Sequence, residues 1–401
     1  MFDNSRRKGK NILALKISKE LSVILSANAL PGKGGQGLNF QHMIQAYLQA
    51  GPESMRLFSQ GPYGDTDTTV VNPSKISKIM SETPYLRKFR DLHVALGDKH
   101  FDSYVAKNLS DCSFFQGATG QSLDSIKKAK MRGAWARLDV ITIHAEAYFT
   151  ELTEECEIFT IKPTLRSSVL DRMLEEYAEA DDIRVMSNVA RRMFIDRGIS
   201  PEKVFSANPP LDWDAFPSHE VIEQKNPQNF VVAYAGLLEP AKGFHYLIKA
   251  FKDFNDPKAE LHLWGSPGAR PVADFMKKAI NDDARIKMKP GSIRQLGYEN
   301  AFGNSSVLVH PSLADGFGYV VAEAMACGKP VIVTENTGAA DLVRDGENGF
   351  IVPIRDNSAI LEKLEILRNS PDLLQSMGQE ARKAVQCLTL ENFSRKLRQG
   401  D

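Results

Sequence analysis

The chain has 401 residues, which is long enough for two or three domains of ordinary size. Its 50 basic and 50 acidic side chains balance to zero net charge, which excludes the bulk electrostatics of a nucleic-acid coat or of a polybasic membrane tether. Four scattered cysteines, no secretory signal and no long apolar run argue against a disulfide scaffold and a membrane span, so we expect a soluble, cytoplasmic protein with no nucleic-acid partner.

Short β-branched runs alternate with helical segments along the chain. Residues 21–28 (LSVILSAN) predict a buried strand, which the glycine cluster GKGGQG and a helix ended by Gly51 follow. Further strands are predicted at 56–60, 139–144, 182–187, 203–208, 230–236, 261–265, 307–312 and 329–335. Alternating strands and helices indicate an α/β protein whose parallel sheets are covered by helices on both faces.

A segment without sustained periodicity separates two such series. Residues 208–228 hold four prolines and read as a linker, and the strand–turn–helix pattern restarts at Phe230. We therefore expect two doubly wound Rossmann-like domains facing each other across a cleft, one spanning 1–222 and one spanning 223–385. Residues 386–401 are expected to form a helix that packs back toward the first domain.

The first glycine cluster is a candidate phosphate site. Gly32, Gly34 and Gly37 form a G-x-G-x-x-G between a strand and a helix, where backbone amides and a helix N-terminus favour an anion. A nicotinamide cofactor would need an acid at the end of the second strand, but Ser59 and Gln60 stand there. A glycine turn without a ligand is the alternative.

A second, more specific cluster runs from His310 to Gly338. A strand ends at Pro311-Ser312, Asp315 lies in the loop, and a helix begins around Phe317 to Tyr319. Amides at the start of a helix favour an anion, and here they belong to Phe317, Gly318, Tyr319 and Val320.

Two carboxylates and one lysine accompany this second cluster. Asp315 and Glu323 are eight residues apart, and carboxylates suit the paired hydroxyls of a sugar and of a ribose. Lys242 opens the helix after the first strand of the second half, where its ammonium could neutralise a phosphate. A lysine in that place is otherwise an ordinary surface residue.

Taken in order, three motifs resemble family 4 of the retaining glycosyltransferases, which have the GT-B fold. They are G-x-L-x-x-x-K-G around Lys242, P-S-x-x-D-G-F-G-x-x-x-x-E-A-M-A-C-G around Asp315, and D-G-x-N-G-F-x-V-P, which begins at Asp345. The resemblance implies transfer of a sugar from a nucleotide-diphosphate donor, with retention at the anomeric carbon and without a metal or another cofactor. It also implies an acceptor hydroxyl on a glycan, a lipid-linked sugar or a small molecule.

The resemblance also assigns roles to individual residues. Lys242 would pair with the leaving diphosphate, Asp315 would lie near the transferred sugar, and Glu323 would hold the ribose. Gly34, Gly35 and Gly37 would lie against the diphosphate or the donor sugar. His144, which ends the strand predicted at 139–144, matches a family histidine that reaches the donor sugar, and a structural hydrogen bond is its alternative role.

Two positions depart from the family pattern. Asp315 stands where the family usually has glutamate, and Leu237 stands where it usually has an arginine that contacts the diphosphate. Loss of that cation would weaken a metal-free leaving-group site unless another cation, such as Lys33 or Arg294, replaces it. These departures keep open a catalytically weak, donor-binding partner subunit, and a sugar-nucleotide epimerase of similar fold is a further alternative.

Two weaker patterns point to a metal or to a membrane. Asp65-Thr66-Asp67 and Asp212-Trp213-Asp214 match the D-x-D of metal-dependent glycosyltransferases, but chance matches are expected among so many acids, so we expect no metal site. Residues 125–137 (SIKKAKMRGAWAR) predict a basic helical stretch, which could give peripheral contact with the inner face of a membrane. A solvated helix face is the alternative.

Overall fold

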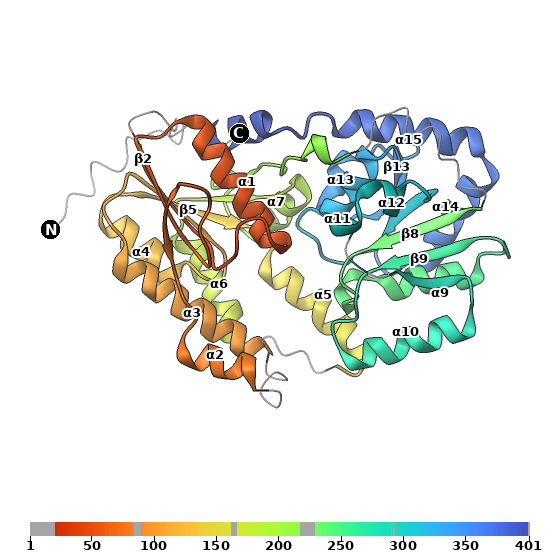
Figure 1. Cartoon of the computed structure of the whole chain (residues 1–401), viewed down its shortest axis with the longest axis horizontal. Helices are drawn as coiled ribbons and strands as arrows, with labels where there is room; N and C mark the ends of the chain where they lie inside the picture. The colour runs from red at the N-terminus through yellow and green to blue at the C-terminus, as the bar shows by residue number, and fades with distance from the viewer. Residues whose placement is uncertain are drawn as a thin grey trace. The chain divides into compact units, whose positions relative to one another are not determined.

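The computed structural model describes residues 21–83, 90–161, 167–216, 229–289, 291 and 293–399. These residues form two compact units, each with its own sheet (Figure 1). The first unit comprises Met1–Glu146, Thr164–Pro210 and Leu390–Asp401, and the second comprises Ala147–Pro163 and Leu211–Thr389. Residues 147–161, which fall within the predicted first domain, therefore pack with the second unit.

The first unit is built on a seven-stranded sheet in the order β3-β2-β1-β4-β5-β6-β7. Every described pair of neighbouring strands runs parallel. The strands are β1 (Ser22–Ser26), β2 (Ser54–Ser59), β3 (Asp67–Val70), β4 (Phe114–Ala118), β5 (Trp135–Val140), β6 (Asp182–Val185) and β7 (Val204–Ser206). The strand order reverses between β1 and β4, which makes the carboxyl ends of these two strands a preferred place for a ligand.

Helices cover the first sheet and close its core. They are α1 (Gly34–Ala50), α2 (Lys75–Glu82), α3 (Arg90–Asn108), α4 (Leu123–Met131), α6 (Ser167–Glu179), α7 (Asn188–Ile195) and α16 (Leu390–Gln399). Phe40, Ile44 and Tyr47 of α1 pack with Phe393 and Leu397 of α16 over the sheet. The Ser394 hydroxyl of α16 also donates to the Ala46 carbonyl at 3.0 Å, so a segment from the end of the chain completes the first core.

The second unit repeats this arrangement with six strands in the order β10-β9-β8-β11-β12-β13. Its described neighbouring strands are also parallel. The strands are β8 (Val231–Ala235), β9 (Glu260–Trp264), β10 (Ile286–Lys289), β11 (Val307–His310), β12 (Val331–Thr334) and β13 (Gly349–Val352). Here the order reverses between β8 and β11.

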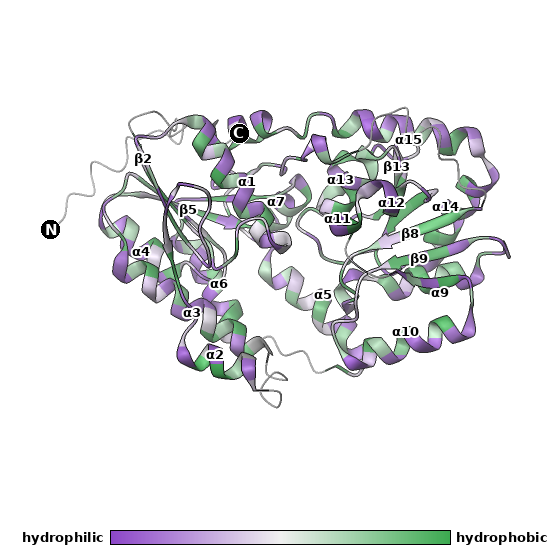
Figure 2. Ribbon diagram, viewed as in Figure 1, coloured by the Kyte–Doolittle hydropathy of each residue, from purple (hydrophilic) through white to green (hydrophobic). Residues whose placement is uncertain are grey.

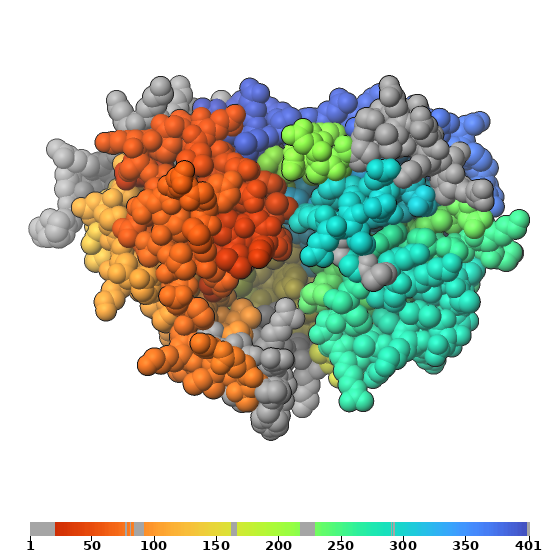
Figure 3. All heavy atoms as spheres, viewed as in Figure 1, coloured from red at the N-terminus to blue at the C-terminus, as the bar shows by residue number. Residues whose placement is uncertain are grey.

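The helices of the second unit bury both faces of its sheet. They are α5 (Ala145–Ile158), α9 (Phe244–Asp253), α10 (Arg270–Asp282), α11 (Ile293–Leu296), α12 (Tyr298–Phe302), α13 (Tyr319–Ala326), α14 (Asn357–Asn369) and α15 (Pro371–Val385), with short 3-10 turns η3 (Trp213–Ala215), η4 (Pro240–Lys242) and η5 (Gly338–Leu342). Strand β8, near the centre of this sheet, is buried over its whole length and consists of Val, Ala and Tyr residues, because neither of its faces meets water (Figure 2). Helix α10 instead lies at the surface of the unit, as the space-filling view shows (Figure 3).

The predicted fold class, with two doubly wound parallel sheets, is confirmed. Among the described residues, no helix combines the length and the apolar character that crossing a bilayer requires. Four strands were missed, namely β3, β4, β10 and β13. The strand predicted at 139–144 is misplaced along the chain, because β5 runs from Trp135 to Val140.

The basic helical stretch predicted at 125–137 is also wrong beyond Met131. Helix α4 ends there, Gly133 adopts a φ of 86° in the turn that follows, and Trp135 begins β5. Arg137 then lies inside the sheet, where Asp182 pairs with it at 2.7 Å. In addition, Lys127 pairs with Glu175, and Arg132 pairs with Asp111. Their charges are therefore locally balanced by acids of the same unit, and the predicted membrane contact gains no support.

Candidate functional site

The candidate site of the second unit lies where two strands of its sheet diverge. Strand β8 ends at Ala235 and β11 ends at His310, and these strands flank the point at which the strand order reverses. Ligands of such sheets bind beyond the carboxyl ends of these strands. Lys242 follows β8 and Asp315 follows β11, so the topology brings two of the predicted residues to one edge.

A close backbone approach holds these two segments together. Gly243 has a φ of 64°, and a Cβ atom there would lie 1.9 Å from the Pro311 carbonyl oxygen, so only glycine fits. The Leu313 amide also donates to the Ala241 carbonyl at 2.9 Å. Lys242 is therefore fixed beside the loop that carries Asp315.

The Asp315 carboxylate has a partner for each of its oxygens. Lys242 Nζ lies 2.7 Å and His310 Nε2 lies 3.0 Å from its Oδ2 atom. The Phe317 amide donates to Oδ1 at 3.3 Å. The side chains of Lys242 and Asp315 are 27% and 17% exposed, so the pair is sheltered but reachable by a ligand.

The charge state of Asp315 follows from this arrangement. Burial alone would raise the pKa of its carboxyl, but the Lys242 ammonium and the His310 ring hold that pKa well below its ordinary value. The group is therefore ionised at neutral pH and unsuited to act as a proton donor there. An anion next to an ammonium can hold a sugar hydroxyl and keep the lysine in place.

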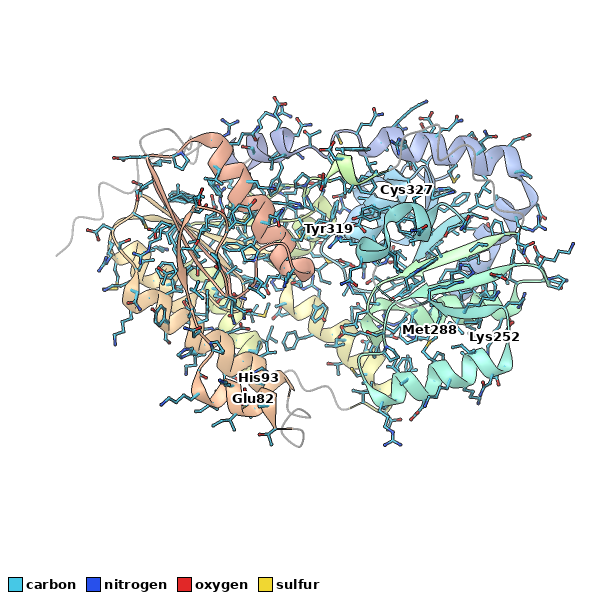
Figure 4. All side chains as sticks on the ribbon, in the orientation of Figure 1. Glu82, His93, Lys252, Met288, Tyr319 and Cys327 are labelled. Atoms are coloured by element: carbon cyan, nitrogen blue, oxygen red, sulfur yellow. The ribbon has the colours of Figure 1, made fainter. Side chains whose placement is uncertain are left out.

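Helix α13 begins directly after this loop at Tyr319, the last residue of the range predicted for its start. Gly318 is the N-cap with a φ of 83°, and a Cβ atom there would lie only 3.0 Å from Thr337 Cγ2. Tyr319 and Val320 form the first turn, and Tyr319 is labelled in Figure 4. Because the Phe317 amide is already bound by Asp315, the predicted anion site rests on the amides that follow it.

Glu323 lies one turn further along α13 and has its own partners. Its Oε1 atom accepts from Arg294 Nε at 2.9 Å, from Arg294 Nη2 at 2.6 Å and from the Tyr298 hydroxyl at 3.1 Å. Burial, followed by the nearby Glu323 charge, raises the pKa of Tyr298. Arg294 also lies over the ring of Tyr319, with 5.4 Å between its Cζ atom and the ring centroid. The carboxylate is thus held in one orientation.

The glycines of the first unit take two different positions. Gly34 and Gly35 open α1 and are exposed, and a Cβ atom on either would meet nothing within 4 Å. Gly37 is buried, and a Cβ atom there would lie 2.0 Å from the Leu30 carbonyl oxygen. Gly34 and Gly35 therefore leave room for a ligand. Gly37 instead allows α1 to pack closely against the backbone at Leu30, in the turn before the helix.

His144 lies in the loop after β5, immediately before α5, and is buried in the first unit. Its Nδ1 atom accepts from the Glu146 amide at 3.3 Å, and its ring packs against those of Tyr177 and Phe194. Burial and then the positive charge of Arg197 lower the pKa of His144 to about 4. The ring is therefore neutral at pH 7, with its proton on Nε2 because Nδ1 accepts.

Three residues that bind Asp315 or Glu323 were not predicted in that role. His310 and Tyr298 were not predicted, although His310 ends β11 within the same motif as Asp315. Arg294, considered as a substitute for the arginine missing at Leu237, binds Glu323 instead. Leu237 is itself 39% exposed, and Lys33, the other candidate, is the exposed N-cap of α1 in the first unit.

The two D-x-D sequences have separate surroundings. Asp67 lies at the start of β3, and Asp214 lies in η3 of the other unit. Within the described ranges, no group of three or more His, Cys, Asp or Glu side chains is placed to hold a metal ion.

With the geometry in place, comparison with known proteins gives one family match. Residues 216–384 match the family model of glycosyl transferases group 1. The capsular polysaccharide biosynthesis glycosyltransferase CapM of Staphylococcus aureus is 34% identical over 39% of this chain and 42% of its own length. A D-inositol 3-phosphate glycosyltransferase of Kribbella flavida is 26% identical over 52% of this chain and 53% of its own. The chain thus spans about half or less of these curated relatives.

Solved structures match over nearly the whole chain. A sucrose-phosphate synthase of Thermosynechococcus elongatus has a TM-score of 0.70 at 19% identity, covering 94% of this chain and 97% of that one. Anabaena HepE in complex with UDP-glucose has a TM-score of 0.67 at 17% identity, covering 94% and 98%. At such low identity these matches establish the fold, which is GT-B. The family match covers the part of the chain that holds most of the second unit.

Proposed function

We propose that the protein transfers a sugar from a nucleoside-diphosphate sugar to the hydroxyl of an acceptor, with retention at the anomeric carbon and without a metal. The observation that carries this proposal is the pairing of Lys242 with Asp315 at the carboxyl ends of β8 and β11. It puts one cation and one sugar-binding anion side by side, beside the start of α13.

The leaving diphosphate would be stabilised by fixed charges. Negative charge grows on it as the anomeric bond breaks, so a positive group aimed at it lowers the barrier more than it strengthens ground-state binding. Lys242 supplies an ammonium, and the first turn of α13 supplies backbone amides and the positive end of the helix dipole. A partly exposed lysine beside a partly exposed helix start fits an anion of two phosphates.

The nucleoside would be held through Glu323. A carboxylate accepts hydrogen bonds from both hydroxyls of a ribose, and Glu323 is kept ready by Arg294 and Tyr298, which both bind its Oε1 atom. The second oxygen, Oε2, would take the ribose. Asp315, near the diphosphate, would contact a hydroxyl of the transferred sugar.

The chemical step follows from these roles. The bond between the anomeric carbon and the phosphate oxygen breaks, and a new bond forms to the acceptor oxygen on the same face of the sugar. The acceptor hydroxyl gives its proton to the departing phosphate oxygen, so no protein base is needed. His144 would meet the donor sugar as a neutral hydrogen-bond donor through Nε2, with Gly34 and Gly35 leaving space for the diphosphate or sugar.

The relatives add support for the substrates. HepE is named in complex with UDP-glucose, which favours a uridine diphosphate hexose as the donor. CapM is named for capsular polysaccharide biosynthesis, which favours a glycan or lipid-linked acceptor, whereas the relative from Kribbella is named for an inositol phosphate. The acceptor is therefore proposed only as a hydroxyl on a glycan, a lipid-linked sugar or a small molecule.

The test is a transfer assay with a panel of UDP-, GDP- and ADP-hexoses carrying a labelled sugar, run with excess EDTA. We expect transfer or slow donor hydrolysis with at least one donor, unaffected by EDTA, and an α-linked product from an α-linked donor by NMR. Complete loss in EDTA that Mg²⁺ or Mn²⁺ reverses would contradict metal independence. An epimerised sugar formed from donor alone would identify an epimerase, and donor binding without turnover would identify a partner subunit.

A further inference from the structure

A pocket of mixed polar and apolar lining in the first unit involves residues to which no role has been assigned above. It has a volume of about 280 Å³, near the lower limit for small-molecule sites. Asn28 follows β1, Gln60 follows β2 and Asn72 follows β3, so the pocket lies beyond the carboxyl ends of three adjacent strands. Gln36 of the first turn of α1 and Asp98 of α3 also line it. It therefore adjoins the glycine turn of the same unit.

A chain of hydrogen bonds orients the polar groups of this pocket. Gln60 Nε2 donates to Asn28 Oδ1 at 2.9 Å, and Asn28 Nδ2 donates to Asp98 Oδ1 at 2.8 Å. The Asn28 backbone amide is in turn bound by Gln121, which follows β4. These contacts fix Asn28 and direct the Asp98 carboxylate, which can accept about four hydrogen bonds in all.

The charges of the pocket select against an anion. Asp98 is a carboxylate, and no lysine or arginine is among the described residues that line the pocket. The positive charge of Arg172, which does not line the pocket, lowers the pKa of Asp98, but the Arg172 guanidinium pairs with Asp102. The remaining ionisable lining groups are His93 and His100 of α3, and His93 is labelled in Figure 4. A phosphate placed here would face the Asp98 charge.

Sheltering from water strengthens the role of Asp98. Burial, only partly offset by the Asn28 hydrogen bond, raises the pKa of its carboxyl to about 6. Desolvation of this kind makes each hydrogen bond from a ligand hydroxyl count for more than it would at the surface. Apolar groups, among them Val71 and Val94, complete the lining and suit the carbon skeleton of a sugar ring.

From this geometry we infer that the pocket binds the acceptor, and that the acceptor presents an uncharged, polyhydroxylated ring such as a sugar without a phosphate. Asp98 and Asn28 would bind its hydroxyls, and Gln36 would bind it from the side of the glycine turn. The identification of the bound sugar as the acceptor rests on the proposed function. The preference of the pocket for uncharged sugars over phosphorylated ones can be tested without any transfer reaction.

The experiment measures binding of named probes to the full chain by ligand-observed NMR. The probes are methyl α-glycosides of glucose, galactose, mannose and N-acetylglucosamine, each compared with the corresponding 6-phosphate where one exists. We expect at least one glycoside to bind, its 6-phosphate to bind more weakly, and Asp98→Asn to raise the glycoside Kd about tenfold, as loss of a hydrogen bond to a charged group would. Asp111→Asn, which changes an exposed acid of the same unit, is the matched control and should leave the Kd unchanged.

A second variant tests the pocket independently, in case Asp98→Asn fails to fold. Val94 lines the pocket and is 49% exposed, so Val94→Lys places a cation at the opening without disturbing the core. It should reverse the preference toward the 6-phosphate. The inference is overturned if no glycoside binds, if the 6-phosphates bind the wild type more tightly, or if Asp98→Asn leaves every Kd unchanged.

Donor binding supplies an independent readout. Titration with UDP-glucose and the other donors of the transfer assay reports on the second unit, and Asp98→Asn should not alter it. Glycoside binding without donor binding or turnover would sink the proposed function and leave the pocket assignment standing. Turnover with a phosphorylated acceptor only would support the proposed function and overturn the pocket assignment.

Discussion

The ammonium of Lys242 lies 2.7 Å from a carboxylate oxygen of Asp315, although 73 positions of sequence separate the two residues. Each residue therefore neutralises the other in a sheltered place, and removing one leaves the other charge poorly compensated. The role proposed for Lys242 at the diphosphate and the role proposed for Asp315 at the transferred sugar must therefore be tested by separate measurements, one for each part of the donor.

Lys242→Ala should lower kcat by about 10²–10³, because it removes one preorganised charge from the leaving diphosphate. Donor Kd should rise less, since the first turn of α13 still faces the phosphates. Steady-state kinetics combined with calorimetric titration of the donor separate the two effects. Lys249→Ala, which changes an exposed lysine on α9, the helix that follows Lys242, is the control. Transfer by Lys242→Ala at the wild-type rate would remove the leaving-group role.

Asp315→Ala should reduce transfer while sparing the affinity for the sugar-free nucleoside diphosphate, because Asp315 is assigned to the sugar. Asp315→Asn is the sharper variant, since its amide oxygen can still accept from the Phe317 amide. Asp315→Glu restores the residue usual in the family, and we expect it to keep activity or to change the preferred donor sugar. The role fails if Asp315→Asn no longer binds the bare nucleotide.

Glu323→Ala should weaken donor and free nucleoside diphosphate alike, by about 1–3 kcal/mol, as expected for a lost polar contact in a buried site. Arg294→Met leaves the carboxylate but removes the guanidinium that orients it, so its loss of affinity should be smaller. Calorimetric titration of both variants with the diphosphate provides the comparison. An unchanged affinity in Glu323→Ala would assign that carboxylate to structure alone.

His144 should make stability depend on pH. Burial lowers its pKa from 6.5 to about 4, so between these values the unfolded chain binds a proton that the folded chain does not. Its contribution to stability is therefore complete above pH 6.5 and is lost as the pH falls toward 4. Thermal unfolding of His144→Gln should show a smaller drop in Tm between pH 7 and pH 5 than the wild type. Identical drops would show that this ring does not titrate as described.

Sequence periodicity located the strands whose side chains are apolar on both faces, such as β1 and β8, to within two residues of their ends. It failed at β5 and β4, which hold buried polar side chains, although it located β6, which holds the buried Arg184. Arg137 is such a group, because Asp182 pairs with it and its guanidinium lies 4.5 Å from the centroid of the Phe205 ring. A charge in the middle of β5 therefore read as a helix surface. Strand β4, in which the buried Gln116 is bound by the Tyr47 hydroxyl, was not predicted at all.

The candidate site was predictable in part for a different reason. Loops after β8 and β11 meet at the reversal of strand order, so their motifs could be brought together by topology alone. Side-chain partners could not, since the choice of Arg294 and Tyr298 as neighbours of Glu323 depends on how α11 and α12 pack against α13. The pocket around Asp98 carries no sequence motif, because its lining combines residues that follow three strands with residues of α1 and α3.

Helix α16 has a consequence for how the chain is made. Its Leu397 carbonyl accepts from the buried Arg137 guanidinium at 2.7 Å, and the Arg184 guanidinium lies 5.1 Å from the centroid of its Phe393 ring. A ribosome delivers β1 to β7 long before it delivers residues 390–399, and most of the second unit, from Leu211 to Thr389, is synthesised in between. Until then the nascent first unit keeps two guanidiniums and an apolar face of α1 open to water. The unit that is synthesised first is thus the one whose folding is finished last.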